Sequence, residues 1–465
     1  MFDASHLTLF YLLAEWAIRL VMIVVIPLRR PPEAARSWLL LVLFLPIPAF
    51  ILYRLIGRAS FPTWRRNRFA KTAPERARIA QTLWDPDIPR SRLSLLAESL
   101  GGFPASAGHR IELLTDYERT IQAMVEAIDG AETRVHVLTY IFADDATGQT
   151  ITNALSRAQL RGVEVRVLFD ALGSRPWVEK TKAMLALAGI DARLVLPVRF
   201  AALRRARGDL RNHRKLCLID GRLGFAGSQN IVDRDFKPGV VNDELVARIE
   251  GPSIAALDAI FASDWFLETR EAIEPLPVIR TEGPAILQAM PSGPDFETPG
   301  YERLLVEMVH AAEERITIVS PYLIPDQALL TAIRNAVARR VRVDIVISSV
   351  VDQHLVSLAQ RSYYDELLAS GVRLHLYRDR LLHAKNVLID EEIGIVGSSN
   401  ADVRSFVLNA EISVILHGGE AGQHLAAIHD AYIASSDPLK LEDWRARPKR
   451  ARLAENLARL VSPLL

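Results

Sequence analysis

Hydrophobic residues are concentrated in two long stretches near the N-terminus of this 465-residue chain. The stretches run from Leu7 to Leu28 and from Trp38 to Ile56, and each is long enough to cross a bilayer as a helix of about 20 residues. Glu15 and Arg19 interrupt the first stretch, but their i,i+4 spacing puts them on one helix face, where they can pair. The pattern therefore predicts a transmembrane hairpin of two helices over residues 1–57.

Two features refine this hairpin. Pro46 and Pro48 lie inside the second stretch and predict a kink there. Basic residues flank the stretches, three between them and a larger group after the second, and Lys and Arg are enriched on the cytoplasmic side of membrane helices. The larger group predicts a multi-pass protein with a cytoplasmic body and both termini inside. The two groups are Arg29, Arg30 and Arg36, then Arg58, Arg65, Arg66, Arg68 and Lys71.

The rest of the chain alternates between amphipathic helix patterns and apolar, β-branched strand patterns. The strand patterns RVHVLTY (134–140) and GVEVRVLFD (162–170) have counterparts in RITIVSPY (315–322) and VRVDIVISS (341–349). Such alternation predicts an α/β fold, here two pseudo-symmetric α/β lobes with central mixed sheets that are largely buried.

These patterns divide the chain into five parts. The segment after the hairpin is rich in Arg, Pro and Ala, which is typical of a linker. The predicted parts are the hairpin (1–57), the linker (58–109), a first lobe (110–275), a second lobe (276–440) and an amphipathic tail (441–465).

One motif occurs in both lobes at a constant offset of 170 residues. Identities held in one register point to an internal duplication rather than to shared composition. The first copy is His213, Lys215, Leu218, Ile219, Asp220, Gly224, Gly227, Ser228 and Asn230, and the second is His383, Lys385, Leu388, Ile389, Asp390, Gly394, Gly397, Ser398 and Asn400.

The duplicated residues suit phosphoryl transfer. Strand alternation puts His213 and Lys215 on one face, and the second copy does the same. Two histidines can divide the work, one as nucleophile and the other as general acid. The lysines Lys215 and Lys385 and the amides of Asn230 and Asn400 can donate to phosphoryl oxygens. This chemistry requires neither a metal nor a cofactor.

The remaining candidates have supporting roles. A nucleophilic imidazole needs an acceptor for its other ring nitrogen, and Glu244 and Glu411, each near the start of an apolar strand, are the best candidates. Asp220 and Asp390 complete the motif, but they lie on the opposite strand face, where a turn-closing role is expected. The glycine before each of Ser228 and Ser398 fits a tight turn, or the serines add donors beside a phosphate; both interpretations stay open. The single cysteine, Cys217, is interpreted as core packing.

The motif H-x-K-x4-D, present twice and followed by G-S-x-N, resembles the signature of the phospholipase D superfamily. Phrases such as TYIFADDATG, SPYLIPD and HAKNVLIDEEIGIVGSSNAD resemble those of bacterial cardiolipin synthases over residues 110–465. The resemblance implies a bacterial inner-membrane enzyme that transfers a phosphatidyl group between two phosphatidylglycerol molecules through a phosphohistidine on His213. It also implies phosphatidylglycerol and anionic membrane lipids as partners.

Three other functions are possible for a chain with this motif: a hydrolase, a nuclease and a scaffold without activity. A phospholipase that passes the phosphohistidine to water shares the first half-reaction. A nuclease is disfavoured by the hairpin and by the near balance of 56 basic and 55 acidic residues, so no nucleic acid is expected as a partner. A catalytically idle membrane scaffold is disfavoured because every reactive residue is present in both copies.

Two basic segments lie outside the motif. Residues 197–211 form an insert that is either a solvated loop or a cuff that grips anionic headgroups. The tail has a basic start and then leucines at 453, 457 and 460, a pattern typical of an interfacial helix, with core packing as the alternative. The insert's arginines are Arg199, Arg204, Arg205, Arg207 and Arg211.

Overall fold

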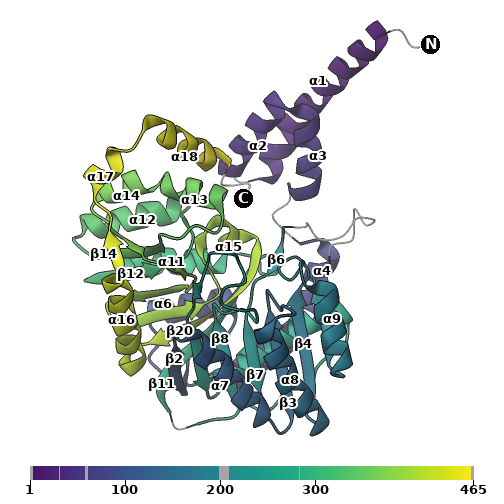
Figure 1. The fold of residues 1–465 in the computed structure, drawn as a ribbon, viewed down its shortest axis with the longest axis vertical. Helices are drawn as coiled ribbons and strands as arrows, with labels where there is room; N and C mark the ends of the chain where they lie inside the picture. The colour runs from purple at the N-terminus through teal and green to yellow at the C-terminus, as the bar shows by residue number, and fades with distance from the viewer. Residues whose placement is uncertain (1–3, 31, 58–60, 198–208, 282, 462–465) are drawn as a thin grey trace.

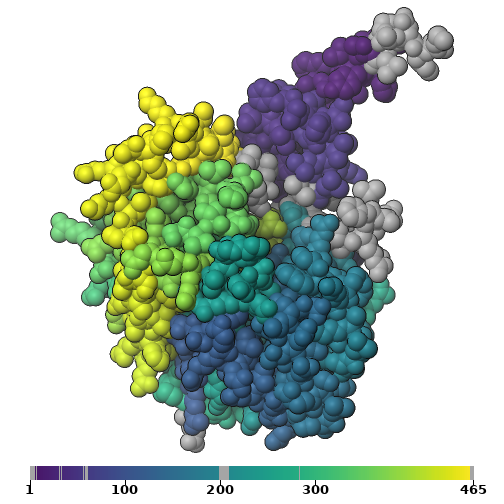
Figure 2. Space-filling model, in the orientation of Figure 1, coloured from purple at the N-terminus to yellow at the C-terminus, as the bar shows by residue number. Residues whose placement is uncertain are grey.

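The computed structural model describes residues 4–30, 32–57, 61–197, 209–281 and 283–461. Its body contains two large mixed sheets, one in each lobe, and a group of helices from the N-terminal apolar region projects from one end (Figure 1). Figure 2 shows the two lobes, blue to teal and green to yellow, packed directly against each other. The predicted pair of α/β lobes is therefore present.

The first lobe contains a seven-stranded sheet. Strands β3, β4 and β5 are parallel, whereas the other neighbouring pairs are antiparallel. In spatial order the strands are β2 (Arg110–Leu114), β10 (Val246–Glu250), β8 (Leu223–Gly227), β7 (Leu216–Ile219), β3 (Arg134–Thr139), β4 (Glu164–Asp170) and β5 (Asp191–Val195).

The second lobe repeats this order and extends it at both edges. The repeated strands are β11 (Gly283–Ser292), β20 (Asn409–His417), β18 (Ile393–Gly397), β17 (Asn386–Ile389), β12 (Arg315–Val319), β14 (Arg342–Ser348) and β15 (Arg373–Tyr377). The additional edge strands are β1 (Ser106–Gly108), beside β11, and β21 (Ser436–Pro438), beside β15. The duplication seen in the sequence is thus a duplication of topology.

One hydrophobic core is shared by the two lobes. It joins the inner faces of both sheets through α10 (Ser253–Thr269) and α16 (Gly419–Ala434). Helix α10 is apolar on nearly all sides, which is typical of a helix buried between layers. Separate cores lie under the outer helices of each lobe. These helices are α7 (Tyr117–Asp129), α8 (Ala146–Leu160) and α9 (Val178–Leu187), then α11 (Gly300–Ala311), α12 (Gln327–Ala338), α13 (His354–Arg361) and α14 (Tyr364–Ser370).

Short strands cross between the lobes beside the duplicated motif. From the first lobe, β6 (Arg211–Asn212) runs parallel to the start of β20 of the second. From the second lobe, β16 (Leu381–Leu382) pairs with β9 (Asn242–Asp243) of the first. Each histidine follows directly after one of these crossing strands. Within the second lobe β13 (Leu323–Ile324) pairs with β19 (Ala401–Asp402), which leads into α15 (Val403–Val407).

The N-terminal apolar region forms three helices, α1 (Ala4–Arg29), α2 (Pro32–Phe44) and α3 (Pro46–Ile56). Helix α1 contains a stretch, Thr8–Arg29, that is long and apolar enough to cross a membrane. The expected pair of Glu15 and Arg19 is formed, with 3.2 Å between the charged atoms.

The second apolar stretch breaks at its prolines. Helix α2 has 13 residues and α3 has 11, so at 1.5 Å per residue neither reaches the roughly 30 Å of a bilayer core. Trp38 and Tyr53 stack edge to face with 5.1 Å between ring centroids, which requires α3 to fold back along α2. Arg19 Nε donates to Leu43 O (3.3 Å), so the far end of α2 reaches only the middle of α1. A hairpin of two membrane-crossing helices is therefore not confirmed.

Residues between the hairpin region and the first lobe contain three helices, α4 (Thr63–Ala70), α5 (Ala73–Leu83) and α6 (Arg92–Gly101). Arg65 on α4 is buried and pairs with Glu268 at the end of α10 (2.7 Å). Helix α6 and strand β1 pack on β11, so this part of the predicted linker completes the second lobe. At the other end of the chain lie α17 (Leu441–Arg445) and α18 (Lys449–Val461).

Candidate active site

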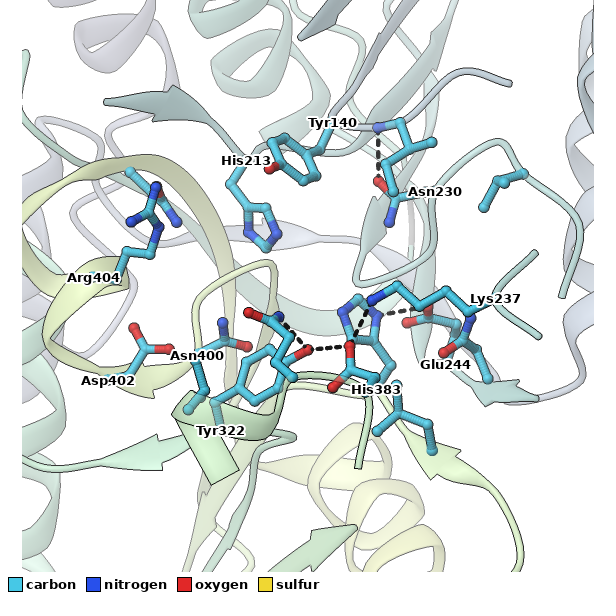
Figure 3. Close-up of a pocket in the computed structure, with 18 of the residues that line it drawn as sticks. Tyr140, His213, Asn230, Lys237, Glu244, Tyr322, His383, Asn400, Asp402 and Arg404 are labelled. Atoms are coloured by element: carbon cyan, nitrogen blue, oxygen red, sulfur yellow. Dashed lines mark hydrogen bonds and ion pairs between the residues drawn. The ribbon is translucent and has the colours of Figure 1, made fainter. Parts of the chain in front are cut away.

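A cavity of about 410 Å³ lies between the lobes, and both motif histidines line it. His213 and Asn230 come from the first lobe, and His383 and Asn400 come from the second (Figure 3). The sequence prediction that the two copies face a common centre is matched by this geometry.

Each histidine is held by the opposite lobe. The backbone N–H of His213 donates to Ala410 O (2.8 Å), and its Nδ1 donates to the Glu411 carboxylate (3.1 Å). The backbone N–H of His383 donates to Asp243 O (2.7 Å), and its Nδ1 donates to Glu244 (2.7 Å). Because Nδ1 is occupied as a donor, Nε2 of each imidazole is the atom left for chemistry, as a nucleophile or base when neutral and as an acid when protonated.

Burial favours the neutral form of both imidazoles, and their surroundings keep the two carboxylates charged. Burial lowers the pKa of His213 to about 4, although the charge of Glu411 opposes this. Burial also lowers the pKa of His383, against the charge of Glu244. For Glu244 and Glu411 burial alone would raise the pKa, but contacts with the histidines and lysines hold it below its usual range. Neutral imidazole is the form that can attack phosphorus.

The motif lysines lie behind the histidines. Lys215 Nζ donates to His213 O (2.6 Å), and Lys385 Nζ donates to His383 O. Burial lowers the pKa of Lys215 to about 7 and that of Lys385 to about 8. Neither lysine is among the residues that line the cavity. Their charges act at short range from beneath the imidazoles.

The motif asparagines do reach the cavity. Asn230 Oδ1 accepts from the backbone N–H of Ile141 (3.1 Å), and Figure 3 shows its amide nitrogen directed into the cavity. Asn400 also lines the cavity, and its Oδ1 is buried without a hydrogen-bond partner among the described residues. Both positions fit the predicted donor role toward a phosphate.

The motif serines and glycines shape the strands. Ser228 Oγ bonds to the backbone of Leu245, whereas Ser398 Oγ donates to Glu411. A Cβ on Gly227 would lie 2.4 Å from Leu245 O, and one on Gly397 would lie 2.5 Å from Ile412 O. The glycines therefore permit close strand approach, and the serines support the glutamate strands instead of binding a phosphate directly.

The motif aspartates lie outside the cavity. Asp220 accepts from the backbone N–H groups of Glu132, Thr133 and Arg134 at 2.8–3.0 Å. Asp390 accepts in the same way from the backbone N–H groups of Glu313, Glu314 and Arg315. A direct catalytic role for either aspartate is thus not supported by the geometry, and the turn-closing role is the one observed. Cys217 is buried between strands, as its interpretation as packing predicts.

Several cavity residues have no counterpart in the sequence reasoning. They are Tyr140, Lys237, Tyr322, Asp352 and Arg404, and all five line the cavity. The two tyrosines lie in the phrases TYIFADDATG and SPYLIPD, which resemble cardiolipin synthases, so this resemblance could have identified them. Lys237 and Asp352 lie in loops, where residue spacing carries no information about direction. Arg404 lies on α15, which is too short to show a periodic pattern.

The basic insert is only partly visible. Arg199, Arg204, Arg205 and Arg207 lie outside the described residues. Arg211 is buried and pairs with Asp170 (3.2 Å), so this arginine is not available to grip a headgroup. Among the described residues, no group of three or more His, Cys, Asp and Glu side chains is arranged to hold a metal ion.

A second cavity of about 830 Å³ lies next to the first, on the side of the N-terminal helices. Val403 of α15 lines both cavities. The second cavity is walled by α2, α12, α15 and α18, with Ala34, Leu330, Phe406 and Leu460 among its lining residues. The exposed Leu453 and Leu457 are on the same helix, α18, whose Glu455 and Ala458 are buried. The exposed leucines favour the interfacial-helix interpretation of the tail over core packing.

Fold and site together define a class: a duplicated phosphodiester transferase whose two lobes share one centre of two histidines. A sequence model of the family described as "Cardiolipin synthase, PLD-like domain" matches residues 124–265 and 305–432. The chain belongs to this family. It is 33% identical over 456 residues to cardiolipin synthase A of Pectobacterium atrosepticum, covering 94% of each chain. It is 32% identical over 486 residues to cardiolipin synthase A of Serratia proteamaculans, covering 99% and 100%.

Solved structures share the fold. The phosphatidylserine synthase of Haemophilus influenzae superposes with a TM-score of 0.60 at 17% identity, covering 80% of this chain and 100% of that one. The polyphosphate kinase of Porphyromonas gingivalis superposes with a TM-score of 0.50 at 13% identity, covering 77% and 52%. At these identities the likeness concerns the fold alone.

Proposed function

We propose that this protein is a cardiolipin synthase that joins two phosphatidylglycerol molecules and releases glycerol. The observation that carries the proposal is the crossed arrangement of two histidine–glutamate pairs around one cavity. Such an arrangement supplies one nucleophile and one general acid on opposite sides of a phosphodiester. Membership of the cardiolipin synthase family supports the same reaction.

The first step forms a covalent adduct. Nε2 of His213 attacks the phosphorus of the first phosphatidylglycerol, and the bond between phosphorus and the glycerol oxygen breaks. His383 enters this step protonated on both ring nitrogens and gives its Nε2 proton to that oxygen, so glycerol leaves neutral and His383 becomes the neutral base for the second step. The amides of Asn230 and Asn400 and the charges of Lys215 and Lys385 stabilise the phosphoryl oxygens.

The second step reverses the proton transfer. The primary hydroxyl of a second phosphatidylglycerol attacks the phosphorus, His383 takes the hydroxyl proton, and the bond from phosphorus to His213 breaks. His213 is assigned as nucleophile because the family resemblance favours it. Glu411 and Glu244 keep the imidazoles in the tautomer that both steps need.

The N-terminal helices support a membrane arrangement as part of this proposal. Helix α1 crosses the bilayer, and α2 and α3 enter from the side of the body and return to it. In the expected two-pass hairpin, the basic residues between the two apolar stretches would lie on the far side of the membrane. In the arrangement proposed here, all the flanking basic residues lie on the side of the body, and Lys and Arg are enriched on the cytoplasmic side. The body is then cytoplasmic, and the second cavity, beside α2 and α18, opens toward lipid acyl chains.

Purified protein incubated with phosphatidylglycerol alone tests the proposal, with lipids and glycerol measured over time. The expected products are cardiolipin and glycerol in equal amounts. Phosphatidic acid as the only lipid product would contradict the proposal and would assign hydrolysis instead. No observation on the site favours hydrolysis.

A further inference from the structure

A polar network lies at the His383 end of the cavity, outside both histidine–glutamate pairs. Lys237, in the loop between β8 and β9, donates to Asp352 Oδ2 (2.7 Å), and the Tyr322 hydroxyl donates to the same oxygen (2.7 Å). Gln353 Nε2 donates to Tyr322 Oη (2.7 Å). All four side chains line the same cavity as His383. Figure 3 shows Lys237 and Tyr322 beside His383, with Arg404 on the other side of the cavity.

Asp352 retains capacity to bind a ligand. Its side chain is only 3% exposed, yet burial is outweighed by the hydrogen bonds from Lys237 and Tyr322, which hold its pKa below the ordinary value. Oδ2 takes both of these bonds. Oδ1 accepts no hydrogen bond from the described residues, and this oxygen is not completely buried. An ionised oxygen at the cavity wall is therefore left for a hydrogen-bond donor.

The chemistry of this network favours a hydroxyl group over a phosphate. A carboxylate with a free lone pair attracts O–H donors and repels phosphoryl oxygens. The network lies beside the imidazole that we assign to exchange a proton with the glycerol oxygen. The glycerol headgroup offers two neighbouring hydroxyls, one to react and one to be held.

We propose that Lys237, Asp352 and Tyr322 form a subsite for the glycerol headgroup, and that this subsite makes a lipid hydroxyl a better acceptor than water. The inference rests on the proposed function and names residues that select its acceptor. The secondary hydroxyl of the second phosphatidylglycerol donates to Asp352 Oδ1. Its primary hydroxyl then lies near His383, gives its proton to Nε2, and forms the new bond to phosphorus as the bond to His213 breaks.

The subsite favours phosphatidylglycerol over water as acceptor because water leaves the Asp352 carboxylate without a hydrogen-bond donor. Phosphatidylglycerol satisfies Asp352 while it reacts, whereas one water molecule cannot both react and satisfy the carboxylate. A site built to bind a substrate hydroxyl discriminates strongly against an acceptor that lacks it. The leaving glycerol of the first step occupies the same subsite, because the second step is the reverse of the first.

Asp352→Asn and Tyr322→Phe test the subsite, with Tyr377→Phe as the matched control. The Tyr377 hydroxyl also donates to an aspartate, Asp243 (2.8 Å), but neither residue lines the cavity. Each protein is given phosphatidylglycerol in detergent micelles, and the ratio of cardiolipin to phosphatidic acid is measured. A second assay follows nitrophenol release from phosphatidyl-p-nitrophenol, which needs neither a bound glycerol nor a strong general acid.

Asp352→Asn is expected to lower the product ratio by about ten- to a hundredfold, the scale of one hydrogen bond to a charged group. Tyr322→Phe should lower it in the same direction, while Tyr377→Phe leaves it unchanged. Nitrophenol release by Tyr377→Phe should match wild type. In Asp352→Asn and Tyr322→Phe it should fall far less than cardiolipin formation, since the histidines and glutamates of the phosphohistidine step are kept.

Other results overturn the inference. A parallel fall in both assays would mean that the network only holds the lobes together, and an unchanged ratio in both cavity variants would mean that it does not bind the headgroup. Wild-type protein that makes phosphatidic acid but no cardiolipin would instead contradict the proposed function, and this is determined before any variant is compared.

Discussion

Each imidazole in the cavity depends on a carboxylate from the other lobe. Glu411 of the second lobe accepts from His213, and Glu244 of the first accepts from His383. Neither lobe alone therefore contains a complete histidine–glutamate pair. The exchange couples the chemistry to the register between the lobes, since a shift of one lobe disturbs both imidazoles together.

Glu411→Gln and Glu244→Gln should each reduce cardiolipin formation by roughly 10²- to 10⁴-fold, the range for disabling an acid–base group. The neutral amide no longer enforces the Nδ1–H tautomer. Glu455→Gln is the matched control. Glu455 is buried like the two cavity glutamates, but its partners are arginines and it does not line the cavity. The steady-state rate of cardiolipin formation is measured for all three variants. Losses below tenfold in both cavity variants would refute the role of the glutamates in orienting the imidazoles.

The pH dependence of kcat/KM should reflect the shifted groups of the free enzyme. Because the pKa of His213 is lowered to about 4, the imidazole stays neutral and nucleophilic well below pH 6. Because the pKa values of Lys215 and Lys385 are lowered to about 7 and about 8, their positive charges are lost as the pH rises through that range. Rates measured at low substrate should therefore fall above about pH 8. A rate that keeps rising through pH 9 would contradict the assigned role of the lysines.

At the level of elements, the duplicated fold could be predicted because its signals are long and periodic. The constant offset implied a common centre for the two copies, and both histidines line one cavity. Strand parity was less informative, because His213 and Lys215 lie before β7 and Lys215 does not line the cavity. The crossing of the lobes could not be predicted, since β6, β9 and β16 have two residues each and show no periodicity. Which glutamate serves which histidine is decided by those crossings.

The remaining differences have physical causes too. The helical content of residues 61–101 was hidden by a composition that resembles a linker. The prolines of the second apolar stretch correctly predicted a break in the helix. Whether the chain then bends slightly or folds back, as α3 does along α2, depends on packing against α1 and could not be predicted. Lys237 and Asp352 lie in loops, so their meeting depends on how the lobes dock.

The glycines before the motif serines make a prediction at this scale. Gly397→Ala should lower stability by about 1–3 kcal/mol, because the added Cβ would overlap the neighbouring strand 2.5 Å away. Gly130→Ala is the control, since its Cβ would meet only ordinary contacts. The thermal unfolding midpoint of each variant in detergent provides the comparison. Equal midpoints would show that the close strand approach does not need glycine.

For the whole molecule, the proposed membrane arrangement of the N-terminal helices makes a prediction about topology. The proposed arrangement, with α1 as the crossing helix and α2 and α3 returning to the body, would put the N-terminal end of α1 across the membrane from the catalytic body. A tag on Met1 should then be digested by external protease in spheroplasts, while a tag on Leu465 is protected. Protection of both tags would instead restore the two-pass hairpin expected from the sequence.

The central claim is that one lobe's histidine carries the phosphatidyl group while the other lobe's histidine moves the proton. Acid quenching after brief reaction with phosphatidylglycerol labelled in its phosphatidyl group measures this directly. His383→Ala should retain labelled phosphatidyl group on the protein, because breakdown of the adduct is slow without its acid–base group. His213→Ala should retain none. Label on His213→Ala and none on His383→Ala would reverse the assignment, and no label on any protein, wild type included, would contradict the covalent route.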